Sequence, residues 1–224
     1  MKILVIDGGT KKDGFTSKAM SIVSSYLEGH GVKVKNIRLH EADIKDCIGC
    51  FNCLKTGLCV IKDDMSGIID TMLGSDGFVV GSPVRNGLVT ACYKRFYERI
   101  TYILGFTLLL EKKYTLAISS VGYMGGKKIG KRFLGLQDVC NTMLSDFIFC
   151  KVGVPTRIKP EDIRERLEDG AKKLVSDINN NTERPFFKSI LFAIDRMFMK
   201  KYIFEKNPEQ YKNVIRCWQD KEYM

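Results

Sequence analysis

The chain has 224 residues, of which 45% are hydrophobic, so it is long enough for one α/β domain with a full core and an appendage. Its formal net charge of +10 favours anionic partners, either phosphate-bearing cofactors or nucleic acid. Because the sequence has neither a base-stacking platform nor zinc-finger spacing, we expect no nucleic-acid partner and favour a dinucleotide phosphate.

Targeting and membrane segments are not expected. The apolar run 1–6 is too short for a signal peptide, and it is followed by Asp7 and Gly8 rather than by a small-residue cleavage site. No uncharged apolar stretch approaches the roughly 20 residues that span a bilayer. We therefore expect a cytoplasmic protein without a transmembrane segment, in which clustered cysteines are metal ligands or redox thiols rather than structural disulfides.

Strand-like apolar runs alternate with apolar residues at helical spacing along the chain. In chain order, the pattern predicts a strand at 2–7, a helix at 15–30, a strand at 32–39, a helix at 63–73, a strand at 77–84, a helix at 90–104, a strand at 114–121, a helix at 130–144, a strand at 147–152 and a helix at 160–178. Repeated alternation with short connections predicts a parallel sheet with helices on both faces. Ligands bind at the carboxyl ends of such strands, which points to the loops after the first, third and fourth strands.

The first of these loops, residues 8–17, reads Gly-Gly-Thr-Lys-Lys-Asp-Gly-Phe-Thr-Ser. It follows a strand and opens a helix, so backbone N–H groups and the helix dipole face one spot and form a phosphate site. Thr10, Thr16 and Ser17 supply hydroxyl groups, and Lys11 supplies positive charge. The loop has neither the nucleotide-triphosphatase motif nor G-x-G-x-x-G. Taken alone, an ordinary polar turn explains it equally well.

A cysteine-rich insertion occupies residues 46–62 and contains Cys47, Cys50, Cys53 and Cys59. Three thiols at C-x2-C-x2-C spacing converge on one point if the backbone curls around it, which is the compact arrangement of an iron–sulfur cluster. Gly57 lets the chain turn back before the fourth cysteine. Structural zinc is a weaker alternative, because its ligands usually come as paired C-x2-C elements.

The second and third loops are also rich in turn residues. Ser82-Pro83 ends the third strand, and Asn86-Gly87 forms a turn with exposed backbone groups that can bind a planar heterocycle. The third loop, residues 119–126, is glycine-rich at the same end of the sheet. Three such loops on successive strand ends are much stronger evidence for a ligand site than any one of them.

Here the sequence resembles a known family, the NAD(P)H-dependent FMN reductases of the flavodoxin-like superfamily. Gly8, Lys11, Gly14, Thr16 and Ser17 match the family's phosphate loop in kind or identity. Two further segments resemble its second flavin loop and following helix, residues 81–87 and 96–99. The cysteines followed by Ile61-Lys-Asp-Asp-Met65 resemble the iron–sulfur flavoprotein subgroup. The resemblance covers about residues 1–180, a flavodoxin-like FMN-binding domain, and leaves 181–224 as a helical extension.

The resemblance implies a three-layer fold around a five-stranded parallel sheet of order 2-1-3-4-5. It also implies homo-oligomers in which one subunit's cysteine segment approaches the other's flavin. The FMN phosphate would be held by Lys11, Thr16 and Ser17, with backbone contacts from Gly9 and Thr10. The isoalloxazine edge would lie along Pro83, Val84, Arg85, Asn86 and Gly87, and its other side would be closed by Ser119, Ser120, Gly122 and Gly126.

Departures from the family pattern bear on the site. Gly9-Thr10 replaces the family's Ser-Pro, and Phe15 replaces an Asn that contacts the phosphate. Arg85 stands where relatives carry an aromatic or small residue, so it either stabilises the anionic reduced ring or points into solvent. Some relatives keep such cysteines as reduced thiols or a disulfide in a dimer contact, although we favour a [4Fe–4S] cluster here.

The expected function is electron transfer through FMN, from NAD(P)H or a ferredoxin-like donor to a small-molecule or protein acceptor. The flavin carries the chemistry, so we expect no catalytic side chain and assign no role to His30 or His40. The basic stretch 127–132 either attracts the 2′-phosphate of NADPH or is simply a solvated helix start, the default for charged residues. The alternative function is a non-catalytic, flavodoxin-like electron carrier.

The extension from Pro185 carries apolar residues on one helical stripe, with basic residues interspersed. The stripe comprises Phe186, Phe187, Ile190, Leu191, Ile194, Met197, Phe198, Tyr202 and Ile203. We expect this helix to pack on its own domain or on a partner subunit. A helix lying on a membrane surface is the weaker alternative.

Overall fold

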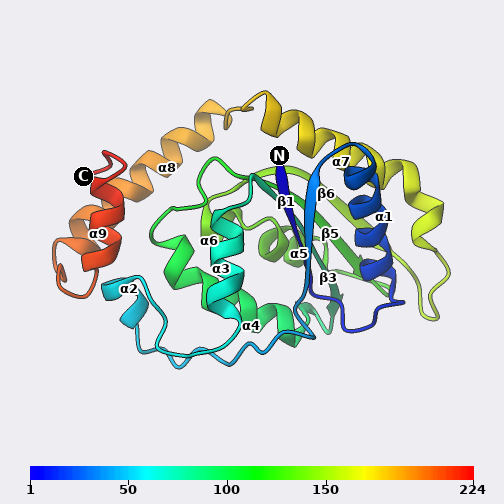
Figure 1. Ribbon diagram of the computed structural model, residues 1–224, viewed down its shortest axis with the longest axis horizontal. Helices are drawn as coiled ribbons and strands as arrows, with labels where there is room; N and C mark the ends of the chain where they lie inside the picture. Colours follow the sequence, from blue (N-terminus) through cyan, green and yellow to red (C-terminus); the bar gives the residue numbers. More distant parts are fainter.

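A computed structural model describes residues 1–224 and contains one sheet with five parallel strands (Figure 1). These are β1 (Lys2–Asp7), β2 (Lys33–Arg38), β3 (Gly77–Arg85), β5 (Tyr114–Val121) and β6 (Met143–Lys151). Their order is β2-β1-β3-β5-β6, which confirms the expected 2-1-3-4-5 arrangement. A sixth, two-residue strand, β4 (Leu88–Val89), pairs antiparallel with the end of β3 and was not expected.

Helices cover both faces of the sheet and create two cores. Alternate residues of β1 point to opposite faces, as the strand period of two requires. Ile3 and Val5 pack with α1 (Phe15–Gly29) and α7 (Arg164–Asn179). On the other face, Leu4 and Ile6 pack with α3 (Met65–Leu73), α4 (Ala91–Ile100) and α5 (Lys127–Leu134).

The predicted helix at 130–144 is wrong. The chain forms α5, then the single turn α6 (Gln137–Cys140), and β6 already begins at Met143, four residues before the expected start at 147. Leu136 and Asn141 adopt left-handed backbone angles (φ 52° and 55°), which break a helix on each side of α6. Periodicity misled the prediction because a short apolar run suits a helix and a half-buried strand alike.

Two other predicted helices are composite. After α4 the chain continues as a π-helical turn, η1 (Thr101–Gly105). The last helix of the sheet domain begins with a 3₁₀ turn, η2 (Pro160–Ile163), before α7. No helix of the structure is both long and apolar enough to cross a bilayer.

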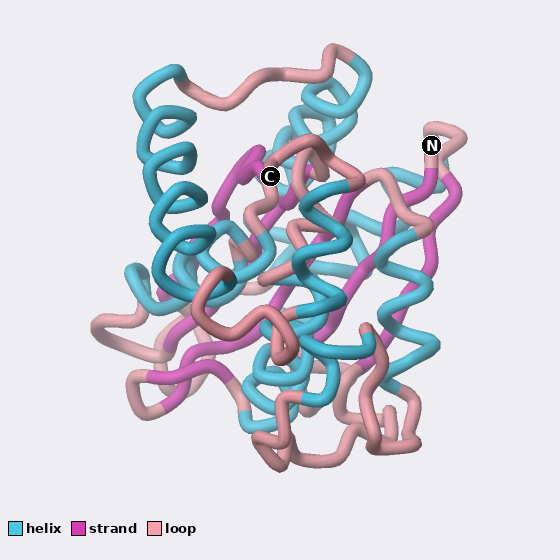
Figure 2. Tube along the Cα trace, turned by 90° about the vertical axis from the view of Figure 1, so that its left-hand side faces the viewer, coloured by secondary structure: helices cyan, strands magenta, loops and turns pink.

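The C-terminal extension forms α8 (Phe186–Met199), a π-helical turn η3 (Lys200–Phe204) and α9 (Lys212–Gln219). In Figure 1, α8 runs along the upper edge and brings α9 down beside α2 (Asn52–Thr56), the short helix of the cysteine segment. Figure 2, viewed from that side, shows the C terminus in front of the strands. The extension therefore covers one end of the sheet domain.

A third core holds α9 and α2 together. It contains Leu54 of α2, Leu108, Phe204, Val214 and Trp218. The indole N–H of Trp218 also donates to the carbonyl oxygen of Phe106 at 2.7 Å, so the buried ring leaves no unsatisfied polar group. The extension thus packs directly against the segment that carries the cysteines.

Candidate functional site

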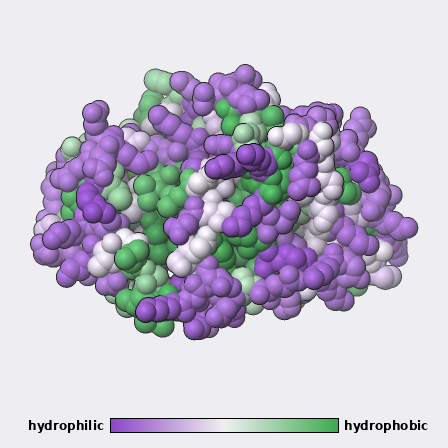
Figure 3. Space-filling model, viewed as in Figure 1, coloured by the Kyte–Doolittle hydropathy of each residue, from purple (hydrophilic) through white to green (hydrophobic).

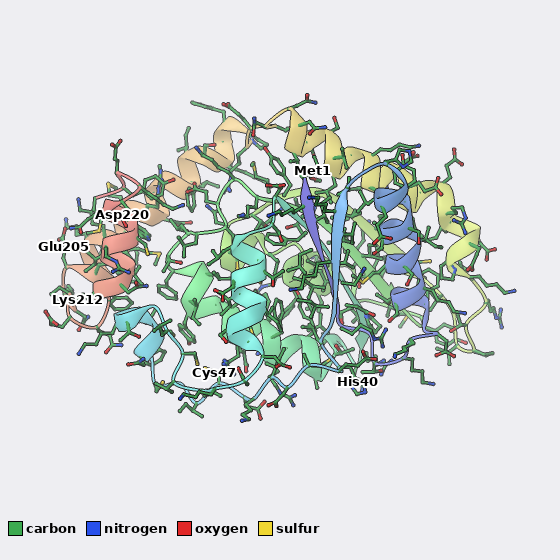
Figure 4. All side chains as sticks on the ribbon, in the orientation of Figure 1. Met1, His40, Cys47, Glu205, Lys212 and Asp220 are labelled. Atoms are coloured by element: carbon green, nitrogen blue, oxygen red, sulfur yellow. The ribbon has the colours of Figure 1, made fainter.

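The three loops singled out in the sequence meet at the carboxyl edge of the sheet. The backbone N–H of Gly8 donates to the carbonyl oxygen of Gly81 at 2.7 Å, and the hydroxyl of Thr90 donates to the carbonyl oxygen of Gly8 at 2.7 Å. The third loop joins them, because the hydroxyls of Thr16 and Ser120 lie 2.9 Å apart. Figure 4 labels His40 and Cys47 at this lower edge, toward which β1 runs from Met1.

The first loop presents an open anion site at the start of α1. Gly14 precedes the helix with an extended backbone; no side chain caps it, and the first turn contains no acidic residue. The first N–H groups of α1 therefore remain available to a ligand. The buried hydroxyl of Ser17 also has no hydrogen-bond partner. A buried orphan hydroxyl beside a free helix N-terminus is what a bound phosphate group would satisfy.

Asp7 and Arg38, which the sequence analysis missed, shape this loop. Oδ1 of Asp7 accepts the N–H of Gly9 at 2.7 Å, and Oδ2 accepts from Nη1 of Arg38 at 3.0 Å. Burial raises the pKa of Asp7, whereas the nearby Ser17 hydroxyl, the N–H of Gly9 and the charge of Arg38 favour its charged form. The N–H of Gly9 is thus engaged within the protein. In the sequence, Asp7 could have been recognised as a carboxylate that ends an apolar strand.

Gly9 leaves room that any side chain would fill. A Cβ atom at this position would lie 2.4 Å from Oγ of Ser17 and 2.9 Å from Oδ1 of Asp7. The next residue, Thr10, is half-buried, and its hydroxyl accepts a hydrogen bond from Nη2 of Arg85 at 3.3 Å. Lys11 is exposed, whereas the neighbouring Lys12 forms an ion pair with Glu41 at 3.1 Å.

The second loop is a β-hairpin. Val84 pairs with Val89 and Arg85 with Leu88, which leaves Asn86 and Gly87 as the two turn residues. Both have positive φ (49° and 76°), the requirement of a tight hairpin turn that Asn-Gly satisfies best. Pro83 is half-buried and Val84 buried, whereas Arg85, Asn86 and Gly87 are exposed at the tip.

The residues predicted at the third loop lie in different surroundings. Ser119 lies fully inside the sheet, and its hydroxyl donates to the carbonyl oxygen of Ser82 at 3.2 Å. Ser120 instead reaches the first loop through Thr16. Gly122 is half-buried and Gly126 adopts a positive φ of 77° directly before α5. The predicted roles of all these residues toward FMN remain predictions.

A fourth loop, which follows β6, also belongs to this edge. The N–H of Gly153 donates to the carbonyl oxygen of Gly122 at 2.8 Å, and the hydroxyl of Tyr123 donates to that of Val154 at 2.8 Å. The sequence analysis missed this loop, because it considered only the connections after the first, third and fourth strands.

The four clustered cysteines are free thiols, and the structure gathers no three metal-ligating side chains into a binding arrangement. They do influence one another. Burial, together with the neighbouring Cys59, Cys47 and Cys50, raises the pKa of Cys53 to about 11. Four cysteine sulfur atoms are a donor set that suits iron or another soft metal, although they do not converge on one point here.

A buried ion pair anchors the cysteine segment to the sheet domain. Arg99 of α4 binds Asp63 through two hydrogen bonds, Nη1 to Oδ2 at 2.6 Å and Nη2 to Oδ1 at 3.1 Å. The side chains are 2% and 0% exposed. Nη1 also donates to the carbonyl oxygen of Lys45 at 2.8 Å, and Nη2 approaches Sγ of Cys59 at 3.4 Å. Burial opposes ionisation of Asp63, but the Arg99 hydrogen bonds lower its pKa.

A large cavity lies away from these loops. It has a volume of about 770 Å³ and is lined by the starts of β5 and β6, at Tyr114 and Met143, and by Phe192 and Met199 of α8. Because these are the amino ends of the strands, the cavity lies at the opposite end of the sheet from the three loops.

Comparison with known proteins agrees with this geometry. Residues 1–132 match the family described as NADPH-dependent FMN reductase. An iron–sulfur flavoprotein of Clostridioides difficile is 28% identical over 223 residues, 98% of each chain. One of Archaeoglobus fulgidus is 30% identical over 179 residues, 77% of this chain and 78% of the other. Among solved structures, a flavone reductase superposes with a TM-score of 0.62 and is 16% identical. The match covers 80% of this chain and 63% of the other, so the two share a fold.

Asp63→Asn should destabilise the protein by about 3 kcal/mol at pH 7, because it leaves the buried Arg99 without a counter-charge. The folded protein lowers the pKa of Asp63, so the pair's contribution is present above the unfolded pKa of about 3.9 and is lost as pH falls through the lower folded value. The difference between wild type and variant should therefore shrink in acid. Urea unfolding followed by circular dichroism at pH 7 and pH 3 measures both effects.

The matched control is Asp46→Asn, which removes an exposed ion pair with Arg95. It should change the free energy of unfolding by less than about 1 kcal/mol. Equal effects of the two substitutions, or a pH-independent effect at Asp63, would contradict the anchoring role of the buried pair.

Proposed function

This chain belongs to the NADPH-dependent FMN reductase family, and from that premise we propose that it passes electrons from NAD(P)H, or from a ferredoxin-like donor, through bound FMN to a small-molecule or protein acceptor. The observation that carries the proposal is the open anion site at the start of α1, with the unpartnered Ser17 hydroxyl and the Thr16–Ser120 pair beside it. When bound, FMN supplies both hydride acceptance and single-electron transfer.

The phosphate of FMN would bind at the first loop. Thr16 and Ser17 offer hydroxyls, the first turn of α1 offers N–H groups, and Lys11 offers a charge that no carboxylate of the chain neutralises. Since Gly9 donates its N–H to Asp7, its part is to keep space free beside Ser17. Thr10 would contact FMN together with Arg85, which donates a hydrogen bond to its hydroxyl.

The ring of FMN would lie between the hairpin and the third loop. The exposed turn at Asn86 and Gly87 presents backbone groups on one side. On the other side, Gly122 and Gly126 of the third loop are packed so closely that a Cβ atom would lie 2.6 Å from Cγ2 of Val154 and 3.1 Å from Cγ1 of Val84. Arg85 lies against the first loop and near the expected ring edge, where a guanidinium favours added negative charge. These side chains orient the ring and tune its electron affinity, and none needs to transfer a proton.

Cys47, Cys50, Cys53 and Cys59 would hold a [4Fe–4S] cluster. Support comes from their spacing, their free thiols, and the name iron–sulfur flavoprotein that relatives in Clostridioides difficile and Archaeoglobus fulgidus carry. Such a cluster supplies one-electron transfer. The hydrogen bond from Arg99 toward Sγ of Cys59 would favour the negatively charged sulfur of a ligand.

Electron partners would approach the exposed carboxyl edge. Lys127 and Lys128 are exposed at the start of α5, directly after the third loop, where they suit the 2′-phosphate of NADPH or an acidic, ferredoxin-like donor. The cysteine segment exposes Ile48, Leu58 and Val60, and Figure 3 shows hydrophobic residues at the lower left, where α2 lies in Figure 1. These apolar side chains suit contact with the flavin edge of a second subunit.

Turnover distinguishes the proposed enzyme from an electron carrier. An enzyme should consume NADPH continuously when ferricyanide or a quinone is supplied as acceptor under anaerobic conditions. A carrier should be reduced by NADPH slowly or not at all, and only a reduced protein donor should drive it. Steady-state NADPH consumption below the rate with free FMN alone would contradict the enzymatic proposal.

Lys11→Ala should raise the dissociation constant of FMN roughly tenfold, the equivalent of about 1.4 kcal/mol, because a phosphate contact is lost. The effect should shrink with added salt, which screens exposed charges. Lys12→Ala is the control, since Lys12 already pairs with Glu41. Fluorescence titration of flavin-free protein measures both constants, and equal values for the two variants would argue against Lys11 as a ligand.

Replacing Cys47, Cys50 or Cys59 singly with Ser should abolish stoichiometric iron and sulfide in protein purified without oxygen, while FMN remains bound. Cys217→Ser, a half-buried cysteine of α9, should retain both. Zinc in place of iron, or no metal in the wild type, would reject the cluster and leave the cysteines as thiols.

A further inference from the structure

Asp7 places a negative charge beside the first loop, where the phosphate of FMN is proposed to bind. Its carboxylate is buried, and Oδ1 accepts the N–H of Gly9 at 2.7 Å. A Cβ atom on Gly9 would lie 2.9 Å from this oxygen and 2.4 Å from Oγ of Ser17, so the carboxylate and the Ser17 hydroxyl flank the same small space. The carboxylate that fixes the loop therefore also repels a phosphate at Ser17, unless a positive charge compensates it.

Arg38 supplies the compensating charge. The parallel register of β1 and β2 sets Asp7 directly beside Arg38, and Nη1 of the guanidinium donates to Oδ2 of Asp7 at 3.0 Å. The side chains of Arg38 and Asp7 are 21% and 8% exposed, so solvent and salt screen this pair less than a surface ion pair. The pairing of two neighbouring strands thus brings the cation to the carboxylate.

The guanidinium of Arg38 is held from two sides. Nε donates to Oε1 of Glu41 at 3.1 Å, while Nη1 donates to Asp7. Glu41 also pairs with Lys12 of the first loop at 3.1 Å. Lys12 and Arg38 lower the pKa of Glu41, so this carboxylate stays charged at neutral pH. Two carboxylates therefore fix the direction in which Arg38 points.

The other groups around Asp7 do not replace this charge. β3 faces it with Gly81, and α1 faces it with the neutral hydroxyl of Ser17. Glu41 acts in the opposite sense, because its negative charge favours the protonated form of Asp7. The remaining charged residues of the first loop are exposed, namely Lys11, Lys12 and Asp13. Without Arg38, Asp7 would remain charged only at a higher pH than in the wild type.

We propose that Arg38 is a positioning residue that lets the phosphate of FMN bind beside Asp7, by cancelling the Asp7 charge and not by touching the phosphate. The inference rests on the proposed function, because it concerns the phosphate site of the first loop. Asp7 holds Gly9 in place, and Arg38 removes the repulsion that this carboxylate would exert on the phosphate. Arg38 thereby sets the preference of the site for FMN over riboflavin, which has the same ring and no phosphate.

Titration of flavin-free, full-length protein with FMN and with riboflavin tests the proposal. Arg38→Met should raise the dissociation constant of FMN roughly tenfold and leave that of riboflavin unchanged, because only FMN carries a phosphate. Arg166→Met is the matched control, since Arg166 pairs with Asp146 of β6, the edge strand opposite β2, and it should bind both flavins like wild type. An equal loss of riboflavin binding in Arg38→Met, or unchanged FMN binding, would overturn the proposal.

A double variant separates charge compensation from direct contact. Asp7→Asn keeps an oxygen for the N–H of Gly9 and removes the charge, so Asp7→Asn combined with Arg38→Met should regain the wild-type affinity for FMN. A double variant as weak as Arg38→Met alone would overturn the proposal, because Arg38 would then either contact the phosphate itself or serve only the structure of the loop.

The pH dependence of FMN binding gives an independent readout. In Arg38→Met the Asp7 charge is lost as pH falls, so the dissociation constant of this variant relative to wild type should approach one between pH 8 and pH 5. The ratio at each pH cancels the titration of the phosphate itself, whose second pKa is about 6. A ratio that does not change with pH would overturn the proposal. A wild type that binds FMN no more tightly than riboflavin would reject the phosphate site, and thus the proposed function together with this inference.

Discussion

The arrangement of the candidate site depends on the buried ion pair between Arg99 and Asp63. A guanidinium at 2% exposure needs partners for its charge and donors, and Asp63, the Lys45 carbonyl and Cys59 pair with its two Nη groups, whereas its Nε has no partner. Arg99 lies near the end of α4, and the N-cap residue at the other end, Thr90, lies beside the hairpin. A helix of 10 residues spans about 15 Å and is rigid, so one element sets the separation of the cysteine segment and the expected flavin position.

The C-terminal extension supplies a second, independent support. Gly57 ends α2 against Asn213 of α9 so closely that a Cβ would lie 2.9 Å from the Asn213 amide oxygen. The side chain of Gln210 donates to the carbonyl oxygen of Phe51 at 3.1 Å, directly before α2. The cysteine segment has little regular structure of its own, and it is therefore held from the α4 side by an ion pair and from the α9 side by apolar packing.

Much of the fold follows from the sequence because its signals are local. β1 contains a continuous apolar run and every residue of β5 is buried, as in strands covered on both faces, and their bounds match the predicted 2–7 and 114–121. The loops at Gly8, Ser82 and Ser119 were predictable because parallel strands bring their carboxyl ends together. The Arg99–Asp63 pair was not predictable, although both residues lie in segments that resemble the family, since contacts between positions 36 residues apart leave no periodic signal.

The absorption spectrum of protein purified without oxygen, recorded before and after addition of NADPH, tests the central claim most directly. The account predicts two flavin bands with a broad additional shoulder in the visible range, both of which lose intensity when NADPH is added, with iron and sulfide present by assay. Flavin bands alone, bleached by NADPH, would leave a flavin reductase in which the cysteines serve the structure. A colourless protein that does not bind added FMN would contradict the account.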